Sequence, residues 1–189
     1  MAVSRVQLSS IKQGFPKSRS MLAGNAAYDP AATFLITRTS PTSGSSVTFS
    51  SIPTGYASIQ VRFSGLNNGG SLYIQLNGDT GTNYSRHAMY GDGSGVFAYS
   101  GADQNKVWLY LVGASTTYPT TGIIDIHDYT STTKNKTIRS IAGKDANVNG
   151  AIELASGAWL STSAVTSLTL TFDANTITSG STFALYGMK

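Results

Sequence analysis

Cysteine is absent from this 189-residue chain, and charged side chains are scarce at 12%. Without cysteine, neither disulfides nor thiolate metal sites can hold the fold or carry chemistry. Soluble domains have about 25% charged residues, so hydroxyl and amide groups must cover this surface, unless part of it is buried against other subunits. No apolar run reaches the about 18 residues of a membrane-spanning helix, and the first residues lack the apolar stretch of a secretory signal. The composition favours a protein that assembles with others.

The few charges are distributed unevenly. Of the 13 lysines and arginines, four lie before residue 29, where there is no acidic residue, and the other nine balance the nine acids. The net charge of +4 therefore comes from Arg5, Lys12, Lys17 and Arg19. Glycines and prolines, among them Gly14 and Pro16, interrupt any helical pattern in this segment. We expect residues 1–30 to form an extended basic docking arm, ordered only where it lies on a partner.

The rest of the chain, residues 31–189, has the pattern of one all-β domain. Short alternating or β-branched runs recur about every ten residues, separated by Gly, Asn, Asp and Pro turns. Alternation puts Ile59, Val61 and Phe63 on an inward face, and likewise Ile124 and Ile126. We predict an antiparallel, jelly-roll-like β-sandwich, because eleven strands exceed one sheet and closure protects their edges. The predicted strands are 32–39, 46–52, 58–66, 71–76, 95–100, 106–113, 121–129, 136–143, 151–156, 164–172 and 182–188.

Catalytic residues are few. Only His87 and His127 could act as imidazole bases, and no G-x-S-x-G motif offers a nucleophile. A pair of carboxylates would have to come from Glu153, the only glutamate, and the eight aspartates, and four of these aspartates lie in Gly/Asn-rich loops. We therefore expect no catalytic residues, no enzyme activity and no cofactor.

One loop has residues that could bind calcium. NGDTGTN offers Asn77, Asp79 and Asn83 at alternating spacing, but it lacks the full calcium-loop pattern with its closing acidic residue. The better interpretation is a hairpin loop, and we predict no metal site.

Aromatic side chains and the basic arm leave two further ligand classes open. Tyrosine and tryptophan rings near the loop 77–95 and in two strands could stack on sugars, although most aromatics in a sandwich fill its core. The candidate glycan-binding residues are Tyr84, Tyr90, Trp108, Tyr110 and Trp159. Nucleic acid is disfavoured, because the body is neutral and the arm offers only Phe15 and Tyr28 as stacking rings.

Several segments also carry a family resemblance. They resemble a family of small virion proteins of tailed bacteriophages over 9–25, 45–62, 77–85, 124–137 and 180–189, the last with Phe183, Leu185, Tyr186 and Gly187. The resemblance implies a jelly-roll-like module exposed on a virion, often trimeric, and attached through its N-terminal segment. It gives the basic arm a particle to dock on.

The arm residues then take different roles. The four cations would contact acidic patches of capsid or tail subunits, the apolar side chains would fill pockets, and Gly14 and Pro16 would set the path of the chain. The apolar residues are Phe15, Met21 and Leu22.

Two functions of different classes follow from the resemblance. The first is an accessory capsid decoration or cement protein that is made in the host cytoplasm and stabilises the virion, with other virion proteins as partners and no membrane. The alternative is a tail-fibre or baseplate tip that binds host-surface glycans. Full-length fibres usually contain long repetitive shafts, which this chain lacks, and this favours decoration.

Overall fold

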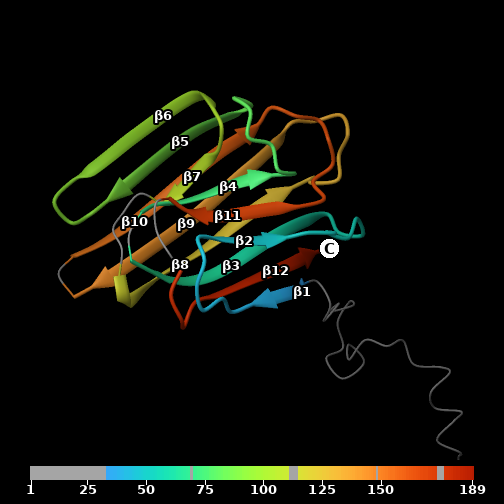
Figure 1. Cartoon of the computed structure of the whole chain (residues 1–189). Coiled ribbons are helices and arrows are strands. Elements are labelled where there is room, and N and C mark those ends of the chain that lie inside the picture. Colours follow the sequence, from blue (N-terminus) through green and yellow to red (C-terminus); the bar gives the residue numbers. More distant parts are fainter. Residues whose placement is uncertain (1–32, 69, 111–114, 148, 174–176) are drawn as a thin grey trace, which may run out of the picture. The chain divides into compact units, whose positions relative to one another are not determined.

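The computed structural model of the chain describes residues 33–189, except 69, 111–114, 148 and 174–176. This part of the chain consists of strands and loops arranged in two antiparallel sheets (Figure 1), which confirms the predicted all-β sandwich. Residues 1–32, which include the whole of the predicted docking arm and all of its residues, lie outside the described residues.

The larger sheet has eight strands. Its order across the sheet is β1 (Thr33–Thr39), β12 (Thr182–Met188), β3 (Ser58–Asn67), β8 (Ser115–His127), β9 (Lys136–Ala146), β10 (Asn149–Trp159), β5 (Tyr84–Gly91) and β6 (Val96–Gln104). The smaller sheet has four strands, in the order β2 (Ser46–Phe49), β11 (Leu168–Phe172), β4 (Leu72–Leu76) and β7 (Val107–Tyr110).

The core lies between the two sheets. The predicted alternation is confirmed, since Ile59, Val61, Ile124 and Ile126 are buried on the inner face of the larger sheet. They pack with side chains from the smaller sheet, such as Leu72, Ile74, Leu168 and Leu170. A single apolar cluster therefore joins the two sheets, as expected for a two-layer domain.

One strand was not predicted from the sequence. The segment Tyr84–Gly91 forms β5, in the region expected to be a loop. Its inward positions hold Tyr84, Arg86 and Ala88, so a buried arginine interrupts the apolar alternation by which strands are recognised. The loop before β5 also differs from the prediction. It connects β4 of the smaller sheet with β5 of the larger one, so it is not a hairpin loop.

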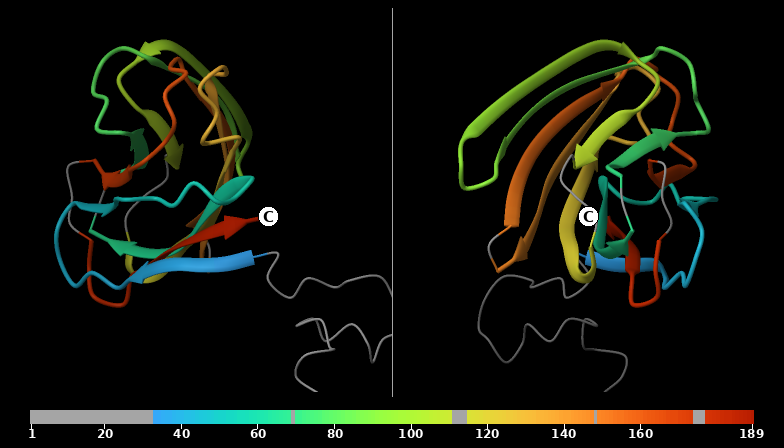
Figure 2. Two further views of the ribbon diagram at one scale, coloured as in Figure 1. Left: turned by 90° about the vertical axis from the view of Figure 1, so that its right-hand side faces the viewer. Right: turned by 60° about the vertical axis from the view of Figure 1, so that its left-hand side comes forward.

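The smaller sheet covers only part of the larger one. Strand β7 packs across β10, β9 and β5, where Val107 lies so close to Gly157 that a side chain there would collide with it. Beyond β7, the β5–β6 hairpin continues past the smaller sheet (Figure 2), and most residues of β6 are exposed on both faces. Within the described residues, the larger sheet thus has an inner face that the smaller sheet partly covers, an exposed outer face, and an end that extends past the smaller sheet.

Candidate docking face

The outer face of the larger sheet carries a continuous row of exposed apolar side chains. Strand register pairs Ile123 of β8 with Ile141 of β9, Ile141 with Leu154 of β10, and Leu154 with Met89 of β5. The row then ends at Ala98 on β6. We call these five residues the apolar row. Leu154 is 55% exposed and Met89 is 51% exposed. Antiparallel sheets that face water normally have polar residues on that side, so a row across five strands indicates a contact surface.

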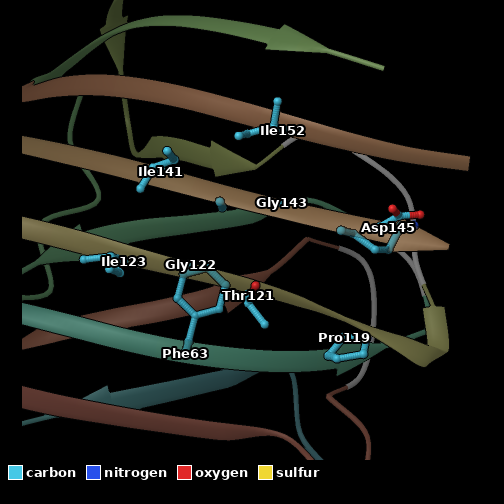
Figure 3. Close-up of a pocket in the computed structure, with 11 residues that line it drawn as sticks. Phe63, Pro119, Thr121, Gly122, Ile123, Ile141, Gly143, Asp145 and Ile152 are labelled. Carbon is cyan, nitrogen blue, oxygen red and sulfur yellow. The ribbon is translucent and has the colours of Figure 1, made fainter. Parts of the chain in front are cut away.

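A hollow lies beside the apolar row. The adjacent row runs through Thr121, Gly143, Ile152, Gly91 and Val96, and its two glycines leave gaps between larger side chains. The hollow at Gly143 has a volume of about 650 Å³. Figure 3 shows the side chains of Ile123, Ile141 and Ile152 around it, with Asp145 and Pro119 at one end. Apolar side chains of a partner could fill this space.

The other flank of the apolar row is polar. Gln60 donates a hydrogen bond to Asp125 over 2.7 Å, and Arg62 donates one to Gln60 over 2.6 Å. Further along, the Arg139 guanidinium lies 2.8 Å from Nε2 of His127. Gln60, Asp125 and Arg139 border one side of the apolar row, and Arg62 lies at its end, opposite Ile123. Polar groups thus adjoin the apolar row as the polar rim of a protein interface adjoins its core.

The inner face of the same strands holds three charged side chains within the apolar core. Arg86 on β5 and Glu153 on β10 form an ion pair of 3.4 Å, and the Glu153 side chain is fully buried. Burial lowers the pKa of Arg86, and the Glu153 carboxylate opposes this shift. Lys136 on β9 is also buried, and its ammonium donates to the backbone carbonyls of Ser131, Lys134 and Thr162. Three charged side chains therefore lie inside, among apolar core residues such as Ile138 and Trp159, while Ile141 and Leu154 face outward.

Two of the predicted glycan-binding residues are buried, which corrects that prediction. Tyr84 is fully buried, and its hydroxyl lies 3.0 Å from the Leu76 amide, while burial raises its pKa to about 12. Trp159 stacks on Tyr84 and donates its indole N–H to Asp79 over 2.6 Å. Neither ring offers a face to a sugar, because both fill the space between the sheets.

The candidate calcium loop is occupied by its own hydrogen bonds. The Asp79 carboxylate accepts bonds from the Trp159 indole, the Asn83 amide and the Gly81 backbone, and the Trp159 bond contributes most to lowering its pKa. The Asn77 side chain instead bonds the segment before β11 at Thr166. Among the residues that the structure describes, no three His, Asp or Glu side chains are grouped as metal ligands would be.

The other candidate rings have neighbours on their faces. Tyr90 stacks with Phe97 and Tyr99, at centroid distances of 4.9 and 5.6 Å. The ammonium of Lys106 lies 4.2 Å above the Trp108 ring. The side chain of Tyr110 lies outside what the structure describes. The four of these predicted residues whose side chains the structure describes therefore do not come together as an open platform.

The apolar row was not among the predicted site residues. A signal was present in the sequence. Ile152 and Leu154 flank Glu153, the only glutamate, so in a strand they lie on the face opposite to it, and they are exposed when Glu153 is buried. The two predicted base candidates also lie apart, His87 on β5 and His127 at the end of β8. Both are exposed.

Comparisons with known proteins leave the docking face to be interpreted from its own geometry. No family model, curated protein or solved structure matches the chain. Within the described ranges there is also no helix long and apolar enough to span a membrane.

Proposed function

We propose that this chain is a non-enzymatic accessory protein of a bacteriophage virion, of the capsid decoration or cement type. Its outer face would lie on shell subunits, and its basic N-terminal arm would bind them across a subunit boundary. The apolar row is the observation that carries this proposal. Five strands present the apolar row, and a contiguous patch of exposed isoleucine, leucine and methionine side chains is typical of an interaction surface.

The size of the face supports a second attachment point. Five strands span about 20 Å, and the apolar row together with the adjacent row occupies about 14 Å along the strands, so the two cover roughly 300 Å² in projection. A standard interface buries about 800 Å² on each partner. The face alone is too small, and the arm would supply the remaining contacts. Its four cations suit acidic patches on the shell, and many weak contacts on a symmetric particle add up.

The mechanism is mechanical. A protein that binds only the assembled shell stabilises it by mass action, because separating the subunits also requires losing the bound copies. The sandwich suits this role, because its two sheets share one apolar core and form a self-supporting body.

Sedimentation with purified particles tests the proposal. Deleting residues 1–28 should leave a folded body that no longer co-sediments with the particle of the phage that encodes it. Leu154→Lys should weaken co-sedimentation, whereas Leu160→Lys should not, since Leu160 is 51% exposed but does not belong to the apolar row. Undiminished binding by both the deletion and Leu154→Lys would overturn the proposal. Hundreds of copies per particle would indicate the shell, and a handful would indicate the tail.

The alternative, a tail-fibre or baseplate tip that binds glycans, has weaker support. Sugar binding by stacking needs an open ring face, and Trp108 and Tyr90 each have a neighbouring group against the ring. Glycan binding that is lost on Trp108→Ala, together with a low copy number, would favour this alternative.

A further inference from the structure

Strand β6 ends the larger sheet and leaves one edge without a neighbouring strand in the described part of the chain. Such an edge presents a row of backbone N–H and C=O groups that can pair with another strand. Its register with β5 is continuous from Val96 to Gly101, and the irregularity in this pairing comes after that stretch. The edge is therefore regular over six residues, long enough to form a ladder.

Devices that normally protect an edge are missing from this stretch. Natural edge strands carry lysine, proline or bulges that prevent pairing, or are very short. Val96–Ala102 contains neither a charged residue nor a proline, and the strand's only charge, Asp103, follows it. The side chains on both faces are also exposed, including Val96 at 77% and Phe97 and Tyr99 at 41%. This edge is open and apolar.

The inner face of the hairpin has a stack of rings that stops at this edge. Phe97 and Tyr99 lie on β6, with Tyr90 of β5 stacked against both, and Arg86 lies 6.0 Å from the Tyr99 ring. On the outer face, the apolar row ends at the same strand, at Ala98. Both surfaces stop where a further strand would continue them.

We propose that β6 pairs antiparallel with β6 of a second copy of this chain, about a two-fold axis at Ala98. A symmetric contact needs no other partner, because each copy carries the same edge. With Ala98 opposite Ala98, Phe97 of each copy lies opposite Tyr99 of the other, and cross-strand aromatic pairs are favourable. The apolar row of each copy then lies on the same side of a continuous sheet. The inference does not depend on the proposed virion role.

The expected contact is modest. Aromatic side chains bury 150–250 Å² each, so the exposed two-fifths of Phe97 and Tyr99 amount to roughly 150 Å² on each copy. The backbone ladder adds to this, but the total stays below a standard interface. The dimer should therefore depend on concentration.

Single-cysteine cross-linking tests the pairing on the full chain, whose lack of cysteine leaves no background. Residues opposite each other in an antiparallel pair have Cα atoms 4.5–5.5 Å apart, within the 4.4–6.8 Å that a disulfide needs. Ala98→Cys should therefore give a disulfide dimer under mild oxidation. Ser100→Cys is the matched control, because it faces the same side but lies opposite Val96 of the other copy. Equal cross-linking of both variants, cross-linking of Ser100→Cys alone, or none would overturn the proposal.

Sedimentation of the uncrosslinked chain gives a second readout. Between about 5 and 200 µM, the unmodified chain should shift from monomer to dimer. Phe97→Lys should stay monomeric over this range, while Leu160→Lys should dimerise like the unmodified chain. Circular dichroism checks that each variant is folded. A chain that stays monomeric throughout, or forms the trimer implied by the family resemblance, would contradict the two-fold pairing.

Discussion

The two faces of strands β5, β9 and β10 each carry residues that burial alone would not select. The inner face holds Arg86, Lys136 and Glu153, all buried, and the outer face exposes Ile141 and Leu154. Burying a pair of charges costs desolvation free energy, and an exposed leucine side chain contributes no hydrophobic stabilisation. The exposed isoleucine and leucine indicate that the outer face makes a contact. The charged side chains on the inner face depend on their ion-pair and hydrogen-bond partners.

The largest expected effect is on the inner face. Glu153→Gln should lower the free energy of unfolding by about 3–5 kcal/mol, because it leaves the buried Arg86 charge without its carboxylate. Urea unfolding measures this. The double variant Arg86→Met with Glu153→Leu should recover most of the loss, since an apolar pair of similar volume fills the space. A loss below about 1 kcal/mol for Glu153→Gln would show that the pair is not important for stability.

Alanine substitutions at two glycines on neighbouring strands compare how much space the inner and outer faces leave for an added side chain. Gly122→Ala points inward, and its added carbon would lie 2.6 Å from the Phe63 ring, so it should cost about 1–3 kcal/mol. Gly143→Ala points outward, where the nearest atom is the Ala151 carbonyl oxygen at 3.2 Å. It should cost less in thermal unfolding but fill the hollow and weaken docking. Equal destabilisation by the two variants would contradict the assignment of faces.

The Asp79 bond to the buried Trp159 predicts a pH dependence. This bond is the main cause that lowers the pKa of Asp79 in the folded state, so the folded chain binds the proton more weakly than the unfolded chain. Its stabilising effect is complete above the ordinary value of 3.8 and is lost as the pH falls through the folded pKa. Asp79→Asn should cost about 1 kcal/mol at pH 7, and the difference should shrink below about pH 4. A gap that is constant with pH would contradict this account.

The smallest expected effect on stability is on the outer face. Leu154→Lys should change the free energy of unfolding by less than about 0.5 kcal/mol, because the side chain is already exposed. Thermal unfolding of Leu154→Lys and Glu153→Gln, measured side by side, compares the two faces directly, because the two residues are neighbours on one strand. A large loss for Leu154→Lys would mean that the outer face belongs to the fold rather than to a contact.

Much of the sandwich could be predicted from alternation and turns. The runs around Ile59 and Ile124 formed strands with the expected inward faces, because their apolar residues recur at every second position. Strand β5 could not be found in this way, because Arg86 occupies an inward position and is stabilised by Glu153, 67 residues away. Sequence alternation gives no information on such a distant partner.

The docking face was harder to predict, for a related reason. In AIELAS the alternation rule would put Ile152 and Leu154 inside, but Glu153 faces inward with Ala151 and Ala155. The apolar row also exists only through the register of five strands that are not all adjacent in sequence. The docking arm stays a prediction, because residues 1–32 lie outside the described part of the chain.

Oxidative footprinting of Met89 tests the central claim most directly. Met89 lies within the apolar row and is 51% exposed, so hydroxyl radicals should oxidise it readily in the free chain. Met188 on β12 lies outside the row and serves as an internal reference. If a partner covers the outer face, Met89 in intact particles should be strongly protected relative to Met188. Equal oxidation of Met89 in free chain and particles would contradict the account.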